Sequence, residues 1–169
     1  MDALTAILTR RSIRKYKQKR IPLETIETLL RAGMAAPSAR NKQPWEFLVI
    51  QNRETLDKIA GWHPYAKMLR EACVAILVCA NTNIQEIEGY CALDCAAATE
   101  NILLAAHALG LGAVWIGIYP RTERIAKIKE MFSLPPFILP ISLISLGYPA
   151  EEKAQRDRFD KTKVHFDRW

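Results

Sequence analysis

Near the start of the chain, apolar residues recur at helical spacing and predict two helices. The first covers residues 2–9, with Asp2 placed to cap its first turn and an apolar face made of Leu4, Ile7 and Leu8. The second starts near Pro22, because the fixed φ of proline suits a first helical turn. It should end before Pro37, and its apolar positions follow helical spacing through Ile26, Leu29, Leu30, Gly33 and Met34.

Farther along, short runs rich in β-branched and aromatic residues alternate with helical patterns. The predicted strands cover residues 45–50, 74–80, 113–118 and 138–146. Helices are predicted over residues 53–60, after Asn52 as a cap, and over 122–132. This alternation predicts a layered α/β or α+β fold with a central sheet.

The longest predicted helix, over residues 92–109, is apolar on most of its sides. It is rich in alanine and poor in charge, and Gly110 and Gly112 mark its end. A helix that is apolar on most sides is also buried on most sides. Two arrangements meet this need: a second subunit covers part of the helix, or the helix is the central core element of one subunit.

The chain changes character from Gly147 onward. Residues 147–169 are polar and charged, and they end in Phe166 and Trp169. Aromatic residues in such a segment favour docking on another surface, and a partner subunit would supply one. We therefore expect one domain, 1–169, whose C-terminal tail 147–169 docks on a dimer.

Size and composition agree with this organisation. The chain has 169 residues, of which 50% are apolar, and a single domain of this length buries about 70% of its unfolded surface. No run approaches the roughly 20 apolar residues that cross a bilayer. Arg10, Arg11 and Arg14 interrupt the segment in which a signal peptide would be apolar. We expect a cytoplasmic protein with no membrane partner.

Positive charge is concentrated at the two ends of the chain. The net charge is +6, and basic residues cluster in 10–20 and again in 153–163. If the two ends meet in space, they form one anion site, which could take nucleic acid, a membrane surface or a small anion. We expect no nucleic-acid partner, because no basic helix or interleaved aromatic motif is present. The four cysteines match no zinc spacing, so no metal is expected.

Several common catalytic motifs are absent. The sequence has no G-x-G-x-x-G after a strand, no Walker A loop and no G-x-S-x-G elbow. Its histidines, His63, His107 and His165, are far apart, and each is expected to be a packing or surface residue. His63 is retained as a candidate pocket residue because it adjoins Pro64 and Tyr65.

Four segments carry the remaining chemistry: 10–14 (Arg-Arg-Ser-Ile-Arg), 37–45 (Pro-Ser-Ala-Arg-Asn-Lys-Gln-Pro-Trp), 115–120 (Trp-Ile-Gly-Ile-Tyr-Pro) and 156–158 (Arg-Asp-Arg). In this order they resemble the nitroreductase family of flavoproteins. The resemblance implies an α+β fold with a mostly antiparallel central sheet, an intertwined homodimer, and FMN at two sites shared between the subunits. It also implies a ping-pong reaction in which NADH or NADPH reduces flavin N5, and a small acceptor such as a nitroaromatic or a quinone is then reduced.

The resemblance further implies which residues bind the cofactor, and it assigns no catalytic residue because flavin N5 carries the chemistry. The implied residues are Arg10, Arg11, Ser12, Arg14, Pro37, Ser38, Ala39, Asn41, Gln43, Lys67, Ile116, Gly117, Arg156 and Arg158. Arg10, Arg156 and Arg158 would hold the phosphate through charge-assisted bonds, with Ser12 as a further donor. Arg14 and Lys67 would lie at the pyrimidine edge, where positive charge stabilises reduced flavin.

The loop from Pro37 to Gln43 would come from the other subunit, and Gly117 would let the backbone approach flavin N5. Two features depart from the family. The segment between Cys79 and Cys91 is short, which predicts an open site. Arg40 and Lys42 make the loop basic, which would suit an anionic acceptor or the phosphate of NADPH, or would leave only exposed charge.

Two other functions remain open at this point. The protein could be a flavoprotein with a different redox reaction, either dehydrogenating or flavin-modifying. From a different class, it could be a non-catalytic basic module that binds nucleic acid or another anion. Taken alone, residues 10–14 are better explained as the solvated end of a helix.

Overall fold

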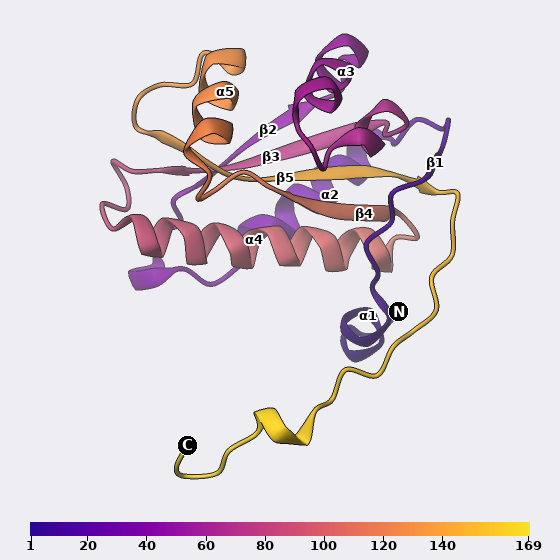
Figure 1. Ribbon diagram of the computed structural model, residues 1–169, viewed down its shortest axis with the longest axis vertical. Coiled ribbons are helices and arrows are strands. Elements are labelled where there is room, and N and C mark those ends of the chain that lie inside the picture. Colours follow the sequence, from indigo (N-terminus) through magenta and orange to yellow (C-terminus); the bar gives the residue numbers. More distant parts are fainter.

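A computed structural model describes residues 1–169 and contains one five-stranded antiparallel sheet (Figure 1). Strand β5 is the centre of the sheet: it pairs with β3 along one edge, and with β4 and then β1 along the other. Strand β2 pairs with the far side of β3. The strands are β1 (Tyr16–Lys17), β2 (Trp45–Ile50), β3 (Val74–Asn81), β4 (Gly112–Gly117) and β5 (Ile138–Pro149).

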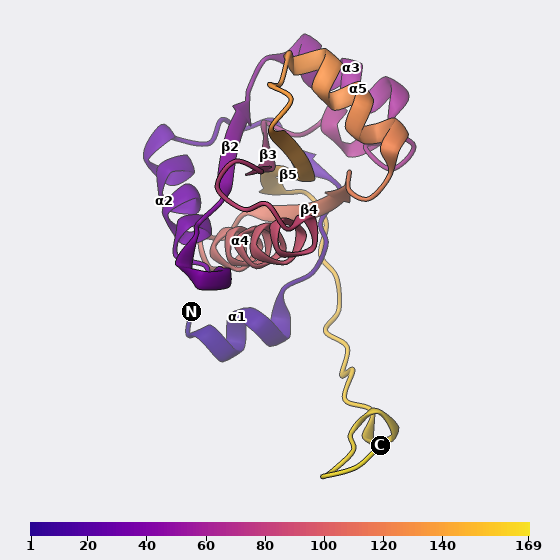
Figure 2. The same cartoon turned by 90° about the vertical axis from the view of Figure 1, so that its left-hand side faces the viewer.

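Helices cover both faces of this sheet, so the body has three layers. The helices are α1 (Ala3–Thr9), α2 (Leu23–Met34), α3 (Arg53–Trp62), α4 (Glu88–Ala108) and α5 (Thr122–Phe132). Helices α2 and α4 lie on one face, and α3 and α5 lie on the other (Figures 1 and 2). Successive residues of β3 alternate between the two hydrophobic cores: Val74, Ile76 and Val78 face α2 and α4, whereas Ala75 and Leu77 face α3 and α5.

Helix α4 lies against the sheet along its whole length. Its sheet side is fully buried, and Gly33 of α2 packs so closely that an added Cβ would lie 2.9 Å from Ile102. The outward side is also apolar: Leu93 is 66% exposed. Within one chain, α4 is therefore buried on the sides that face the sheet and α2, and its outward side is left uncovered.

Most predicted elements are present, and the differences have physical reasons. The caps Asp2 and Asn52 accept hydrogen bonds from Thr5 N and Thr55 N. Helix α4 begins at Glu88 rather than at residue 92. The sequence pattern missed the first turn because that turn is mostly exposed and lacks the run of alanines. Strand β1 has only two residues, too few to show periodicity in the sequence. It pairs with the end of β5, where Tyr16 lies opposite Pro149.

Two segments lie outside the three-layer body. Helix α1 lies below α4, and the chain after β5 runs past α1 and away from the sheet (Figure 1). Side chains near its end are exposed, including Phe159, Phe166 and Trp169. None of the helices combines the length and the apolar character needed to span a bilayer.

Candidate functional site

The two basic ends of the chain lie side by side. Ala150 N donates to Lys15 O at 2.9 Å, and Lys153 Nζ donates to Ser12 O at 2.7 Å. Glu151 accepts from Arg14 N at 2.6 Å, and this bond lowers the pKa of the Glu151 carboxyl. After it leaves β5, the tail thus runs alongside residues 10–15 and back toward α1.

The meeting of the two ends creates a cationic cavity of about 510 Å³. Five of its lining residues are basic, and no carboxylate is among them. The lining residues are Arg11, Ser12, Arg14, Lys153, Ala154, Arg156 and Arg158. A neighbouring cavity adds Arg10 beside Arg11, Arg156 and Arg158. Five of the implied residues therefore share one cavity, and a sixth lies next to it.

The arginines of this cluster differ in how they are engaged. Arg11 donates from Nε to Ala154 O at 3.0 Å and from Nη1 to Leu8 O and Arg10 O, so it ties the tail to the end of α1. Its buried Nη2 has no partner. Arg10 pairs with Glu100 of α4 at 3.0 Å. Arg14, Arg156 and Arg158 form no ion pair, and their guanidinium groups are available to an anion.

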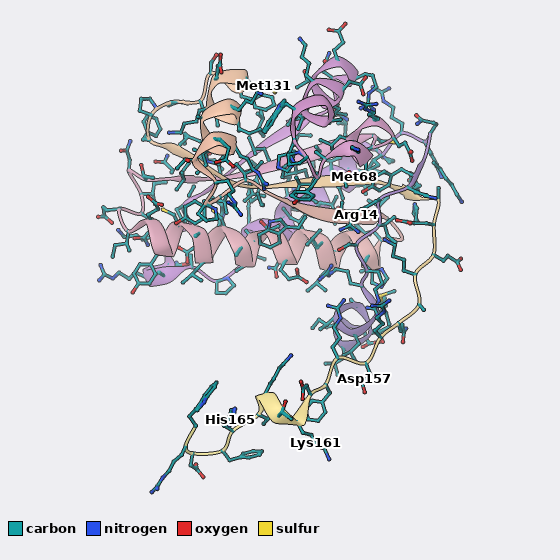
Figure 3. All side chains as sticks on the ribbon, in the orientation of Figure 1. Arg14, Met68, Met131, Asp157, Lys161 and His165 are labelled. Atoms are coloured by element: carbon teal, nitrogen blue, oxygen red, sulfur yellow. The ribbon has the colours of Figure 1, made fainter.

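A second cavity of about 460 Å³ adjoins the cationic one and shares Arg14 with it. Residues of β4 form one wall, and the loop after α3 forms the other. Its lining residues are Arg14, Pro64, Tyr65, Lys67, Met68, Val114, Trp115, Ile116 and Gly117. Figure 3 shows Arg14 and Met68 at the same end of the sheet, and Asp157 on the tail beside α1. A mostly apolar space with two cations thus continues directly from the anion site.

Close backbone packing fixes residues 12–14 against β4. Ser12 forms a parallel bridge with Ala113, and Ile13 N donates to Ala113 O at 3.0 Å. Gly112 makes this approach possible, because a Cβ there would lie 2.6 Å from Ile13 Cγ2. The strand that carries Ile116 and Gly117 therefore also positions Arg14.

The loop Pro37–Gln43 lies elsewhere in the chain. Neither cavity described above is lined by any of its residues. It packs near the start of α4, where Ala39 N donates to Asp94 Oδ1 at 2.9 Å, whereas Thr9 contacts His107 near the other end of α4. Thirteen residues of helix, about 20 Å, separate Asp94 from His107.

The loop has an unusual backbone. Arg40, Asn41 and Gln43 have φ values of 55°, 53° and 50°, a conformation that costs non-glycine residues about 1–3 kcal/mol each. Ser38 Oγ accepts from Gln43 N, and Asn41 Oδ1 accepts from Gln43 Nε2, each at 2.9 Å. Lys42 pairs with Glu86, which lowers the pKa of the Glu86 carboxyl, and leaves Arg40 as the loop's unpaired cation.

Several contributing residues did not follow from the motifs. Asp94 holds the loop, and it could have been noticed as a carboxylate within an apolar helix. Lys153 lies in the basic tail but outside the Arg-Asp-Arg segment. Arg124, whose Nη1 donates to Gly117 O at 2.8 Å, carried no sequence signal. Tyr65 lines the apolar cavity, whereas His63 lies behind it.

With this geometry established, comparison with known proteins identifies the family. The model of the nitroreductase family matches residues 7–64 and 62–148. The chain belongs to the nitroreductase family. A protein of Methanothermobacter thermautotrophicus named "Putative NADH dehydrogenase/NAD(P)H nitroreductase" is 50% identical over 169 residues, which are 100% of this chain and 88% of that protein.

Solved structures agree with the fold of this nitroreductase. A Parabacteroides distasonis protein of the same name has a TM-score of 0.95 at 41% identity, covering 99% of this chain and 98% of that one. An FMN-dependent nitroreductase from Clostridium difficile has a TM-score of 0.91 at 30% identity, covering 98% and 99%. The α+β class with a mostly antiparallel sheet is thereby confirmed.

Proposed function

We propose that this protein binds FMN and passes reducing equivalents from NADH or NADPH to a small organic acceptor, such as a nitroaromatic or a quinone. The supporting observation is the pair of cavities joined at Arg14. One is lined by five basic residues and no carboxylate, and the other is a mostly apolar space of about 460 Å³. FMN has this same division into a phosphate and a planar ring.

The residues present fit the two parts of FMN. Arg156 and Arg158 have no ion pair and would hold the phosphate, because guanidinium groups form strong, partly bidentate bonds with phosphate oxygens. Arg10, whose Nε is paired with Glu100, would add its remaining N–H donors. The free Nη2 of Arg11 would add a donor. When bound, FMN supplies the hydride-accepting and hydride-donating chemistry.

The cations of the apolar cavity would tune that chemistry. Arg14 and Lys67 line the cavity together with Ile116 and Gly117. Positive charge at the flavin's pyrimidine edge favours its reduced form. Tyr65 and Trp115 provide aromatic surface on which a flat acceptor or the nicotinamide can stack.

We also propose that the site is completed by a second copy of the chain. Pro37, Ser38, Ala39, Asn41 and Gln43 do not reach either cavity within one chain, so a partner subunit would supply them. The exposed apolar surfaces of α1, α4 and the tail would form the contact. The arrangement is an intertwined homodimer with the tail docked across it.

The first experiment is a visible spectrum of the purified protein before and after anaerobic addition of NADH or NADPH. We expect bound flavin that bleaches with at least one of the two nucleotides. Bound flavin that neither nucleotide reduces would favour a different redox reaction. A folded, colourless protein that takes up no FMN and binds nucleic acid in a salt-sensitive way would favour the basic binding module.

Substitution of the tail arginine tests the phosphate site. Arg158→Ala should weaken FMN binding by about tenfold or more, because a hydrogen bond to a charged group contributes roughly 1.5–3 kcal/mol. Arg168→Ala is the matched control, since Arg168 is a tail arginine outside both cavities. Equal FMN affinity in the two variants, measured by fluorescence titration, would contradict the proposed phosphate site.

A further inference from the structure

A buried histidine lies directly behind the apolar cavity. His63 caps the C-terminal end of α3, and the residue is 1% exposed. Its Nε2 lies 3.1 Å from Gly117 O, and its Nδ1 accepts from Tyr65 N at 3.2 Å. Gly117 and Tyr65 are on opposite walls of the cavity. One side chain thus joins the two walls.

These contacts fix the protonation of the ring. Nδ1 faces a backbone donor, so it must be unprotonated, and Nε2 must carry the hydrogen that is donated to Gly117 O. Only the neutral Nε2–H tautomer satisfies both partners. A protonated ring would direct a second N–H at Tyr65 N and lose that bond.

Neighbouring groups reinforce this state. Arg124 of α5 donates to the same Gly117 oxygen at 2.8 Å, and its guanidinium lies 5.5 Å from the centre of the Tyr65 ring. Trp62 packs edge-on against the imidazole, and Lys127 Nζ lies over the Trp62 ring, 5.2 Å from its centre. Gly117 O is therefore held by two donors, one from each helix on this face of the sheet.

We propose that His63 is a positioning residue of the flavin site, which in its neutral tautomer joins the Tyr65–Lys67 loop to Gly117 and so sets the width of the cavity. This role rests on the proposed function of the cavity. Protonation of His63 would release Tyr65 and the loop that carries Lys67. The site would therefore loosen at acidic pH.

The electrostatics give the direction of the pH effect. Burial is the main cause that lowers the pKa of His63 from its ordinary value of 6.5; the Arg124 charge acts in the same direction, and the bond to Gly117 opposes it. The unfolded chain therefore binds this proton more readily than the folded one. The stabilisation is complete above pH 6.5 and is lost as the pH falls below that value.

Three substitutions of His63 separate the effect of its hydrogen bond to Gly117 O from that of its hydrogen bond with Tyr65 N. His63→Gln keeps a donor directed at Gly117 O, His63→Asn keeps an acceptor for Tyr65 N, and His63→Phe keeps neither. Trp62→Phe is the control, because it keeps an aromatic ring beside the imidazole and removes only the Trp62 Nε1 and the second ring, and the Nε1 is buried without a partner. We expect the acceptor KM to rise about tenfold in His63→Phe and less in the other two, with kcat changed less.

The pH profile distinguishes positioning from mere packing. As the pH falls through the lowered pKa of His63, which lies below the ordinary 6.5, the wild-type KM for the acceptor should rise, whereas that of His63→Gln should stay level. The pKa of His107 is also lowered, by burial first, but this group is present in both proteins and cancels in the comparison. Parallel profiles for the two proteins would overturn the proposal.

A readout that needs no flavin completes the test. Nitrogen-15 NMR of uniformly labelled protein, with the His63 signals assigned through His63→Gln, should show the neutral Nε2–H tautomer and slow hydrogen exchange of the Tyr65 amide. A charged ring or an Nδ1–H tautomer at neutral pH would overturn the inference even if FMN binds. Failure of the wild-type protein to bind FMN would instead contradict the proposed function and leave this structural result standing.

Discussion

At the scale of single residues, one carboxylate of α4 attaches the loop Pro37–Gln43 to the body of the protein. Asp94 is 5% exposed, its Oδ1 accepts from Ala39 N, and its Oδ2 has no partner. A buried, half-satisfied carboxylate is costly. It is retained in an apolar helix next to a loop with three positive φ values, which indicates that it holds that loop in place.

Substitution of Asp94 tests this account. Asp94→Ala leaves Ala39 N without an acceptor and should lower the free energy of unfolding by about 1–3 kcal/mol. Asp94→Asn keeps an oxygen toward Ala39 and is the matched control. Urea unfolding measures the stability, and FMN titration measures the effect on the site. If both variants unfold at the same urea concentration, the hydrogen bond from Ala39 N does not account for the contribution of Asp94 to stability.

At the scale of elements, the body depends on close approaches of backbone as much as on hydrophobic periodicity. Because Gly112 has no side chain, Ile13 can pack directly against its backbone. The ring of Tyr16 packs against Gly147 in the same way, and a Cβ added to Gly147 would lie only 2.7 Å from Tyr16 Cδ1. These contacts hold the N-terminal segment against β4 and β5. The same sheet edge therefore determines both stability and the position of Arg14.

A pair of glycine substitutions separates these contributions. Gly112→Ala should displace Ile13, destabilise the protein, and weaken FMN binding through Ser12 and Arg14. Gly61→Ala, in α3, meets no atom within 4 Å and should stabilise the protein by about 0.5–1 kcal/mol with unchanged FMN affinity. Thermal unfolding and FMN titration measure both effects. Undiminished FMN affinity in Gly112→Ala would show that this approach does not position the site.

At the scale of the whole molecule, a single chain leaves its binding site incomplete and its apolar surface uncovered. Leu4 and Leu8 of α1, Leu93 of α4, and Phe166 and Trp169 of the tail are all exposed. Apolar patches of this kind mark interaction surfaces. A second copy would cover them and would bring a loop Pro37–Gln43 to each pair of cavities.

The dimer is directly testable. The protein should sediment at twice its mass of 19.2 kDa at micromolar concentration. Leu93→Lys places a charge in the expected contact and should shift the protein toward monomer, with loss of bound FMN. Ala126→Lys, on the exposed side of α5, introduces the same charge away from that contact and serves as the control. A flavin-loaded wild-type monomer would contradict a site shared between subunits.

The sequence by itself determined the helices with marked periodicity, their caps and the four longer strands. Local interactions decide these features: side chains at helical spacing share a face, and Asp2 and Asn52 cap the turns that follow them. It also marked the basic residues at both ends, and their order led to the family.

The tertiary structure alone decided which residues meet. It placed the tail beside residues 10–14, joined the cationic and apolar cavities at Arg14, and separated both from the loop Pro37–Gln43. It also revealed the roles of His63 and Asp94. Both are single buried polar residues whose partners are mostly backbone groups of other elements, and the chemistry of backbone groups leaves no mark in the sequence.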